Sequence, residues 1–544
     1  MKINILREYL NFYRNKNKYI KLNKEIFKNK NKLSASQVLI EFNAYSNFHV
    51  LASYLVNFLS DKFLSKIIAF NNYSLISHNF NVGILQRIKF FLGSKIGLGY
   101  FGIYKSFGTT AFILPKKDAY LEKKAKEFYK KNFFRISNKN QLCSLKCDGI
   151  KIGDLIHDGY LKYKKIYTFE LYDKDFQEYF CDALILFFFF KKYFLENNVK
   201  AVVGCMAVYP FAISLRVSIL LNIPTFTILE GKVYRHDKNN LNNHQSAGFK
   251  NYRKIFKSFN LDKKNKLLKQ GSKILNLRMT GKTTYKIYQN TVTKSSFHKN
   301  FQKKNVLIKN KKIKILILTH EYFDAPNAYG GFFFPNHYEW VKSLLKFSFK
   351  NSHYDWYIKD HPSYSGKIAL TQKSTHETTK YLIKKFNPNV NYIDPDISHH
   401  QIVSEGINFV CTVHGSPLFE YSFYGVPVIP ASINHPCIAY NFALQTYNKK
   451  EYFKKLKNLT NLSIKINIKE IFEFYYMHFI FFNSNSFYDK FDNFMRKYKK
   501  YEYYYTPYFY KYWYENWNIK DYEKKNRKLN LFYNSRDYIL THTN

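Results

Sequence analysis

Short apolar segments alternate with longer amphipathic ones along this chain, and that alternation constrains its fold more than any other feature. In the N-terminal half, VLIEFNAY (38–45) and KIIAFNNY (66–73) are typical of buried strands, and the helical pattern NFHVLASYLVNFLSDKF (47–63) separates them. The same order returns at VKAVVGC (199–205) and IPTFTI (223–228), which flank another helical segment. Strands that alternate with helices predict a parallel sheet joined by crossover helices.

A second α/β unit begins at KIKILILTH (312–320), a strongly apolar strand that ends in polar residues. Further strands are expected, with helices between them, at DWYIKD (355–360), VNYID (390–394), INFVCTV (407–413) and VPVIPA (426–431). A chain of 544 residues is too long for one ordinary hydrophobic core. The sequence therefore predicts an α/β protein with two parallel-sheet domains.

Changes in composition mark the expected domain boundaries. The stretch 261–312 is rich in Lys and Asn and has no sustained strand pattern, whereas the sequence after Leu459 becomes helical and rich in Tyr, Phe and Lys. Because apolar rings are costly to expose, we expect the helices of this tail to pack back across the domains. The predicted division is a basic lead-in (1–35), an N-terminal domain (36–300), a linker (301–311), a C-terminal domain (312–460) and a helical, aromatic-rich tail (461–544).

The formal net charge of +47 is extreme, and two explanations for it remain open. A genome rich in A and T would favour Lys, Asn, Ile, Phe and Tyr together. Alternatively, the charge attracts an anionic partner such as nucleic acid or a phospholipid surface. No recognised nucleic-acid motif accompanies the basic tail. We therefore expect no nucleic-acid partner and retain peripheral association with an anionic membrane.

The cysteines and the apolar runs indicate in which cellular compartment the protein is expected. Six scattered cysteines, mostly with apolar neighbours, are typical of reduced thiols in a cytoplasmic protein. Cys143 and Cys147 are four residues apart, but no second Cys/His pair follows at zinc-ligand spacing, so no metal is predicted. No secretory signal pattern is present, and the most apolar run, Ala183 to Phe190, is too short for a bilayer span of about 20 residues. The expected location is the cytoplasm, and the inner face of the plasma membrane is the surface that the basic charge would approach.

The strongest local pattern for chemistry is INFVCTVHGSPLFEYSFYGVPVIPA (407–431), in which an apolar strand leads into a short helix and then another strand. Ser416 suits the N-cap of that helix, and Gly425 suits the position just after its end. Amide groups at such a helix start, which Gly415 leaves accessible beside His414, can hold a phosphate. An ordinary strand-helix turn would have the same pattern.

Two further predictions concern residues that could contact a nucleotide bound in this region. Glu420 lies one position beyond the capping-box position, so capping does not account for it. One helical turn into the helix, its carboxylate could accept hydrogen bonds from ribose hydroxyls. The pattern WYIKDHPSYSG (356–366) brings Lys359, His361 and Ser363 to the carboxyl end of a strand, where open α/β sheets bind ligands. Because this loop precedes the His-Gly-Ser turn by one or two β-α units, we expect the two loops to share one crevice.

Candidate acid–base groups follow the first strand of the C-terminal domain, in LTHEYFDAPNAYGGFFFPNHYEW (318–340). His320, Glu321 and Asp324 are concentrated there and could supply acid–base chemistry, or could only cap a helix. If this loop begins as a helical turn, His320 and Asp324 converge. Glu230, which follows a strand of the N-terminal domain, is the competing base.

Together these segments resemble the capsule polysaccharide biosynthesis proteins, which look like GT-B glycosyltransferases. The likeness covers roughly residues 140–460. It is carried by HEYFDAP (320–326), Lys-x-His-Pro (359–362), TVHGS with the following Glu and GVPVI (412–429), NHP (434–436) and, in the N-terminal half, GIKIGDLIHDGYL (149–161).

The resemblance implies two Rossmann-like domains that face each other across a cleft. The C-terminal domain would bind a nucleotide-sugar donor and the N-terminal domain the growing glycan. Related sialyl- and Kdo-type transferases use a His-Pro motif on the nucleotide phosphate, which implies that role for His361, and phosphate contact for Ser416 and its turn. The nucleotide sugar would be a co-substrate, and no metal or other cofactor is implied.

The resemblance implies a glycosyltransferase of capsule or surface polysaccharide synthesis, which transfers a sugar from a nucleotide-activated donor to a glycan or lipid-linked acceptor. A polymer phosphotransferase of the glycerophosphate type on the same scaffold is the alternative, and a nucleotide-sugar epimerase is a third. A non-enzymatic protein that binds nucleic acid or a membrane surface through its charge also remains open.

Overall fold

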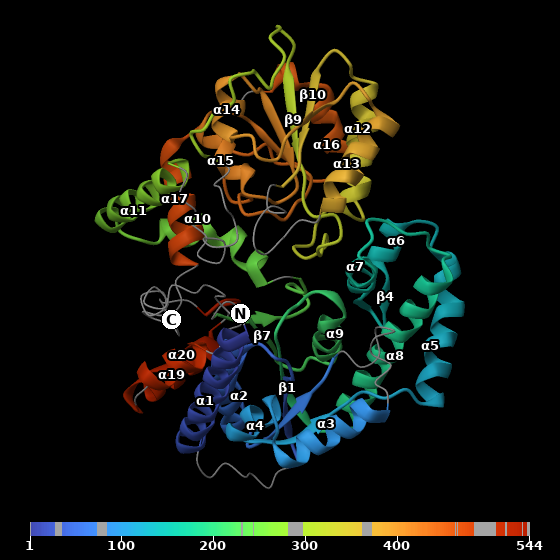
Figure 1. Ribbon diagram of the computed structural model, residues 1–544, viewed down its shortest axis with the longest axis vertical. Coiled ribbons are helices and arrows are strands. Elements are labelled where there is room, and N and C mark those ends of the chain that lie inside the picture. Colours follow the sequence, from blue (N-terminus) through green and yellow to red (C-terminus); the bar gives the residue numbers. More distant parts are fainter. Residues whose placement is uncertain are drawn as a thin grey trace. The chain divides into compact units, whose positions relative to one another are not determined.

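Two units share the chain, and each is built around a mostly parallel sheet (Figure 1). The first unit comprises residues 1–163, 170–244 and 485–544, and the second comprises residues 164–169 and 245–484. The computed structural model describes residues 2–27, 35–72, 84–229, 232–242, 244–280, 297–361, 373–462, 464, 466–482, 508–516, 519–535 and 537–540.

The sheet of the first unit has the strand order β3-β2-β1-β6-β7-β8. Neighbouring strands are parallel except for the last pair, β7 and β8, which is antiparallel. The strands are β1 (Gln37–Glu41), β2 (Lys66–Phe70), β3 (Thr109–Ile113), β6 (Val199–Gly204), β7 (Thr225–Leu229) and β8 (Lys232–His236). All five residues of β1 are buried, as expected for a parallel strand that is covered on both faces.

Helices cover both faces of this first sheet. On one face, Val38 and Ile40 of β1 pack with Leu55 of α2. On the other, Phe70 of β2 meets Phe190 of α8, with ring centroids 5.4 Å apart. The described helices before the tail are α1 (Lys2–Ile26), α2 (Ser46–Lys62), α3 (Ile84–Ile96), α4 (Tyr100–Ser106), α5 (Ala119–Asn132), α6 (Lys139–Ser144), α7 (Gly153–Lys164), α8 (Lys174–Glu196) and α9 (Ile213–Leu220), with a hairpin of β4 (Lys146–Cys147) and β5 (Ile150–Lys151) before α7.

The sheet of the second unit has the strand order β11-β10-β9-β12-β13, and all of its pairs are parallel. The strands are β9 (Lys314–Leu318), β10 (Asp355–Lys359), β11 (Asn391–Ile393), β12 (Phe409–Thr412) and β13 (Val428–Pro430). The first strand in sequence therefore lies at the centre, and the chain winds outward from it in both directions, which is the doubly wound Rossmann-like arrangement.

Two separate apolar clusters cover the two faces of this second sheet. Leu316 and Val410 face the cluster that includes Phe419 of α15 and Phe474 of α17. The opposite face packs against the cluster around Trp340 of α12. The described helices of this unit are α10 (Tyr252–Lys257), α11 (Leu261–Met279), α12 (His337–Phe349), α13 (Lys373–Phe386), α14 (His399–Ser404), α15 (Pro417–Phe423), α16 (Lys449–Lys457) and α17 (Ile468–Tyr476), which a π-helical turn, η8 (Met477–Phe481), follows.

The prediction of two Rossmann-like α/β domains is confirmed. Each of the nine strands expected from apolar runs is present, within a few residues of its expected ends. The strands β3 and β8 were not expected, because their residues are less uniformly apolar and β8 forms an antiparallel edge. The segment 147–163, for which no strand or helix was predicted, contributes β5 and the largely buried helix α7.

The unit boundaries differ from those expected at residues 300 and 460. The second unit already begins at residue 245, because α11 packs along α17 rather than on the first sheet. Gly271 makes this packing close: a Cβ atom there would lie only 1.9 Å from the carbonyl oxygen of Phe472. Residues 461–484 likewise stay with the second unit.

The remainder of the tail returns to the first unit as helices, as expected for a segment so rich in aromatic rings. The helices α19 (Tyr508–Asn516) and α20 (Ile519–Asn534) pack against α1 and α2 (Figure 1). Tyr510 stacks on Tyr19 with ring centroids 4.8 Å apart, and both side chains are fully buried. Among the helices that the structure describes, none combines the length and apolar character needed to cross a membrane.

Arg235 of β8 anchors the end of α20, and its replacement tests whether the tail is part of the first unit. Its guanidinium donates to the carbonyl oxygens of Ser535 at 2.6 Å and of Phe532 and Tyr533 at 2.8 Å. A cation suits these carbonyl groups at a helix C-terminus. We expect Arg235→Met to lower the free energy of unfolding by about 2 kcal/mol, because charged hydrogen bonds contribute about 1.5–3 kcal/mol and this side chain is half-buried.

Hydrogen exchange measured by mass spectrometry should show faster exchange in residues 519–535 of this variant. Arg135→Met, which removes an exposed arginine of the same unit, is the control and should leave that exchange unchanged. Equal exchange rates in the two variants would mean that Arg235 does not hold the C-terminal helix.

Candidate functional site

The strand order of the second sheet reverses at β9, which lies between β10 and β12. The chain leaves β9 toward β10 on one side and later returns to β12 on the other. The loops after β9 and β12 therefore part in opposite directions at the carboxyl edge, and open α/β sheets bind ligands at this point. His320 follows β9, and His414, Gly415 and Ser416 follow β12, so these candidate residues lie at the reversal point.

The imidazole rings of three histidines meet at the reversal point. The ring centroids of His320 and His414 are 4.9 Å apart, and His337, the first residue of α12, stacks on His320 at 4.8 Å. The hydroxyl of Thr412 lies 3.3 Å from Nε2 of His320. A Cβ atom on Gly415 would come within 3.1 Å of the His320 ring, so glycine lets the two loops approach.

All three imidazoles are neutral at physiological pH. Burial, with a smaller effect of the nearby His361, lowers the pKa of His320 to about 3. Burial and the neighbouring rings lower the pKa values of His337 and His414 well below the usual value. Neutral imidazoles can donate and accept hydrogen bonds but bring no positive charge. Any anion bound here needs a cation from elsewhere.

Arg278, from the last turn of α11, supplies that cation. Its guanidinium forms an ion pair with the carboxylate of Glu420, and its Nη2 lies 3.4 Å from the hydroxyl of Ser416. Burial lowers the pKa of His399 well below its usual value, and the charges of Lys359 and Arg278 lower it further. The charges of Arg278 and Lys359 are therefore both felt at His399, in the second unit.

The positions of Ser416 and Glu420 correct two predictions. Ser416 precedes α15 as expected, but its side chain caps no amide and instead donates to Oε2 of Glu420 at 3.0 Å. Glu420 is 2% exposed and binds Arg278 through its other oxygen, so its carboxylate points inward rather than toward a ribose. The physical reason is that a buried carboxylate needs a charged partner. Gly425 follows the C-cap at φ +78° as predicted.

The expected donor residues of β10 separate in the structure. Lys359 is 1% exposed, and its ammonium donates to the carbonyl oxygen of Pro395 at 2.7 Å. Burial lowers the pKa of Lys359 to about 8, although nearby carboxylates oppose the shift. The side chain of His361 is exposed at the end of the strand. Ser363 lies outside the described residues.

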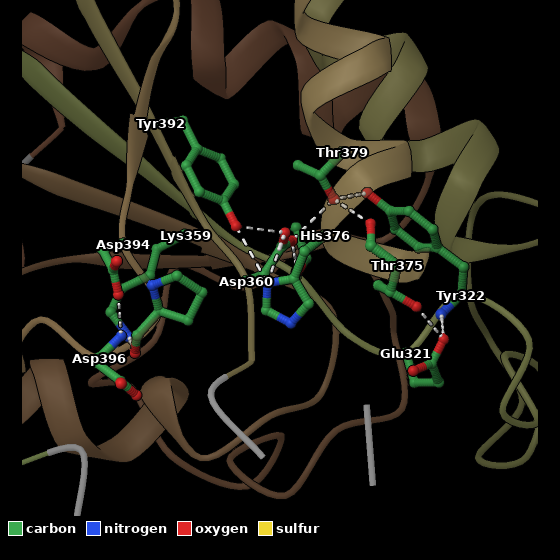
Figure 2. A network of polar contacts seen from close by, with 12 residues as sticks. Glu321, Tyr322, Lys359, Asp360, Thr375, His376, Thr379, Tyr392, Asp394 and Asp396 are labelled. Atoms are coloured by element: carbon green, nitrogen blue, oxygen red, sulfur yellow. Dashed lines mark hydrogen bonds and ion pairs between the residues drawn. The ribbon is translucent and has the colours of Figure 1, made fainter. Parts of the chain in front are cut away.

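Asp360, between these two residues, is the centre of a buried polar network (Figure 2). Its carboxyl group accepts hydrogen bonds from the hydroxyls of Thr319 at 2.5 Å, Thr379 at 2.9 Å and Tyr392 at 3.1 Å. Burial raises the pKa of Asp360 to about 6. The network joins the ends of β9, β10 and β11 to α13.

The loop that carries His320 is held on both sides. Thr319 donates to Asp360, and the carboxylate of Glu321 accepts hydrogen bonds from the hydroxyl of Thr375 and from the amide of Tyr322 (Figure 2). Glu321 is 8% exposed. These contacts of Glu321 therefore hold the loop in place.

Asp324 does not converge with His320 in the predicted way. The loop after β9 contains a turn and no helix, and Ala325 has the uncommon φ of +43°. The ring of His320 faces His337 and His414, whereas the side chain of Asp324 is exposed. The convergence assumed one turn of helix, which this backbone does not form. Glu230, the competing base, lies outside the described residues.

The first sheet has an equivalent reversal point between β1 and β6. Glu41, the last residue of β1, is 1% exposed there, and its Oε2 accepts a hydrogen bond from the amide of Cys205 at 2.8 Å. Its other oxygen, Oε1, has no hydrogen-bond partner in the structure. Burial raises the pKa of Glu41 to about 7.

Sequence reasoning missed Arg278, His337 and Glu41. Arg278 lay in a segment assigned to the other domain, and His337 resembled a helix-start residue after the N-cap Asn336. Glu41 ends an apolar strand, and a carboxylate at that position is the one signal that could have identified it.

Comparison with known proteins gives no match to a family model or to a curated protein. Among solved structures, the chain is similar to the UDP-GlcNAc 2-epimerase from Neisseria meningitidis bound to UDP-GlcNAc, at 10% identity over 81% of this chain and 98% of that one, with a TM-score of 0.22. It is also similar to a glycosyltransferase from Rickettsia africae, at 11% identity over 82% of this chain and 93% of that one, with a TM-score of 0.24. A third similar structure is MnaA from S. aureus in a co-structure with UDP, at 10% identity over 85% of this chain and 96% of that one, with a TM-score of 0.24. These TM-scores are low, so the assignment of two Rossmann-like units rests on the topology of the sheets.

The pKa of Glu41 predicts a measurable dependence of stability on pH. The pKa rises from 4.5 to about 7 on folding, so its stabilising contribution is complete below pH 4.5 and is lost as pH rises through 7. Between pH 5 and pH 8, the wild type should lose about 2.5 kcal/mol of unfolding free energy relative to Glu41→Gln, which does not titrate.

Urea unfolding of both proteins at several pH values measures this difference. Glu178→Gln, at an exposed position on α8, is the control and should remain parallel to the wild type. A constant difference between Glu41→Gln and the wild type across this range would show that Glu41 does not titrate as expected.

Proposed function

We propose that this protein is a nucleotide-sugar-dependent glycosyltransferase of capsule or surface polysaccharide synthesis. The observation that carries the proposal is the position of His320, His414 and Ser416 at the reversal point of the second sheet. This is the place where open α/β sheets bind nucleotides. The glycine between His414 and Ser416 and the nearby Arg278 add backbone access and positive charge, both of which suit a phosphate.

In this proposal the second unit binds the donor phosphates. Arg278 and the hydroxyl of Ser416 lie 3.4 Å apart and would contact the phosphate oxygens together. His361, exposed at the end of β10, would donate from its ring nitrogen. The ion pair with Glu420 orients Arg278, so that its charge is held in place before the ligand arrives.

Loss of His361 tests the donor site. We expect His361→Ala to weaken nucleotide binding by about ten- to a hundred-fold, because a charge-assisted hydrogen bond contributes about 1.5–3 kcal/mol. Isothermal titration with the best-binding nucleotide measures the change. That nucleotide is first chosen by thermal shift, since a ligand at a hundred times its Kd adds about 2.7 kcal/mol of stability.

His353→Ala removes an exposed histidine that lies before β10, and it serves as the matched control. Unchanged affinity in His361→Ala, or equal losses in both variants, would refute the phosphate role of His361.

Sugar transfer also needs a group that takes the proton of the acceptor hydroxyl. With a pKa of about 3, His320 is a weak base, so another group must take this proton. Asp324 is exposed on the same loop and is the proposed base. Glu230, which follows β7 in the first unit, is its competitor.

Kinetics distinguish the two carboxylates. We expect Asp324→Asn to lower kcat at least about a hundred-fold with nearly unchanged nucleotide affinity, because general bases contribute about 10²–10⁴-fold. A purely structural role would instead lower thermal stability. If Glu230→Gln abolishes turnover while Asp324→Asn does not, the base belongs to the first unit.

The proposal includes a glycan or lipid-linked acceptor bound by the first unit, and peripheral association with an anionic membrane through the charge of +47. The products separate the alternative reactions. A glycosyltransferase releases nucleotide only when an acceptor accepts the sugar, whereas a phosphotransferase leaves a phosphodiester in the product. An epimerase changes the sugar without any acceptor.

A further inference from the structure

Three histidines that are far apart in the sequence meet in the second unit. His320 follows β9, His337 opens α12 and His414 follows β12. One ring nitrogen from each lies within 4.8 Å of the others. In the part of the chain that the structure describes, no other three His, Cys, Asp or Glu side chains converge in this way.

One of these imidazoles has an unsatisfied polar atom. His337 is 1% exposed, and its Nδ1 has no hydrogen-bond partner. Buried polar atoms are nearly always bonded to protein, water or an ion, so an orphaned nitrogen requires an explanation. His337 also stacks on His320 in nearly parallel planes, at 19°. Stacking accounts for the faces of the rings, but it leaves Nδ1 in the ring plane without a partner.

We propose that His320, His337 and His414 bind one divalent transition-metal ion of the zinc class. Imidazole nitrogen is a preferred ligand of Zn²⁺ and its neighbours in the first transition row, whereas Mg²⁺ and Ca²⁺ require oxygen ligands, which this set lacks. Three protein ligands with a fourth position open are typical of metal sites that bind a further molecule.

Movement of the three imidazole side chains is enough to bring their nitrogens to the spacing of a tetrahedral zinc site. With Zn–N bonds of about 2.0–2.1 Å, tetrahedral coordination places the ligand nitrogens roughly 3.4 Å apart. The ligand nitrogens lie within 4.8 Å of one another, so the closure needed is at most about 1.4 Å. This closure would tilt the stack of His320 on His337. Thr412 would remain beside His320, and an outer hydrogen bond of this kind fixes which ring nitrogen faces the metal.

The sequence predicted no metal, because the spacing of residues 320, 337 and 414 matches no local ligand motif. The metal site does not rest on the proposed function, since the ion binds to protein side chains alone. If the donor site is also correct, a phosphate oxygen of the donor is the group that would occupy the open position.

Cobalt binding to the full chain tests the proposal. After removal of adventitious metal with a chelator, titration with Co²⁺ should give one equivalent with the strong visible absorption of four-coordinate cobalt. Zinc content after gel filtration should independently give one equivalent. His337→Ala should weaken binding at least ten-fold and abolish the four-coordinate spectrum. His414→Gln, at a partly exposed ligand, provides a second variant in case His337→Ala does not fold.

His353→Ala keeps all three ligands and should bind as the wild type does. Weak, multiple-site binding without the four-coordinate spectrum in the wild type would overturn the proposal. Undiminished binding in folded His414→Gln would also overturn it, because the metal would then lie at other histidines. The nucleotide titrations of the proposed donor site are measured without added metal, so failure of the metal site and failure of the donor site are distinguishable.

Discussion

The site in the second unit depends on the hydrogen bonds that the buried carboxyl group of Asp360 accepts. Hydroxyl groups from Thr319, Thr379 and Tyr392 donate to it, so one side chain joins three strand ends and a helix. Burial raises the pKa of this carboxyl group to about 6, and the three hydrogen bonds oppose part of that rise because they favour the ionised form. Since Thr319 directly precedes His320, this network determines where the imidazole cluster lies.

Five strands of the first sheet follow the same order as the five strands of the second, but the two sheets carry different titratable groups at their reversal points. Both sheets reverse direction beside their first strand, and both place titratable side chains at the reversal point. In the second unit these are neutral imidazoles with Arg278 and Lys359 nearby, which suits an anionic ligand. In the first unit the corresponding group is Glu41, a carboxyl with a raised pKa and no cation at hydrogen-bond distance among the described residues. This contrast fits a division into a donor-binding and an acceptor-binding unit, as proposed.

Much of the fold could be predicted because burial and sequence pattern coincide in parallel strands. The apolar runs at β1, β6 and β9 are buried along their whole length or nearly so, which is why their positions were predictable to within a few residues. The candidate site was less predictable. Ser416 lies where the strand-helix pattern placed it, but Glu420 turns inward because Arg278, 142 residues earlier, neutralises it. Gly271 shows the same limit, since its need for a hydrogen in place of a side chain comes from the backbone of α17.

The sequence by itself determined the two α/β units, most of the strands that form them and the loops in which His320, His361 and Ser416 lie. These features follow from local periodicity and from the rule that parallel strands end at one edge of a sheet. Only the tertiary structure decided which side chains meet there: His337 with His320, Arg278 with Ser416, and α11 with the second unit. Contacts between distant segments depend on packing and on the pairing of buried charges, and neither leaves a periodic signal in the sequence.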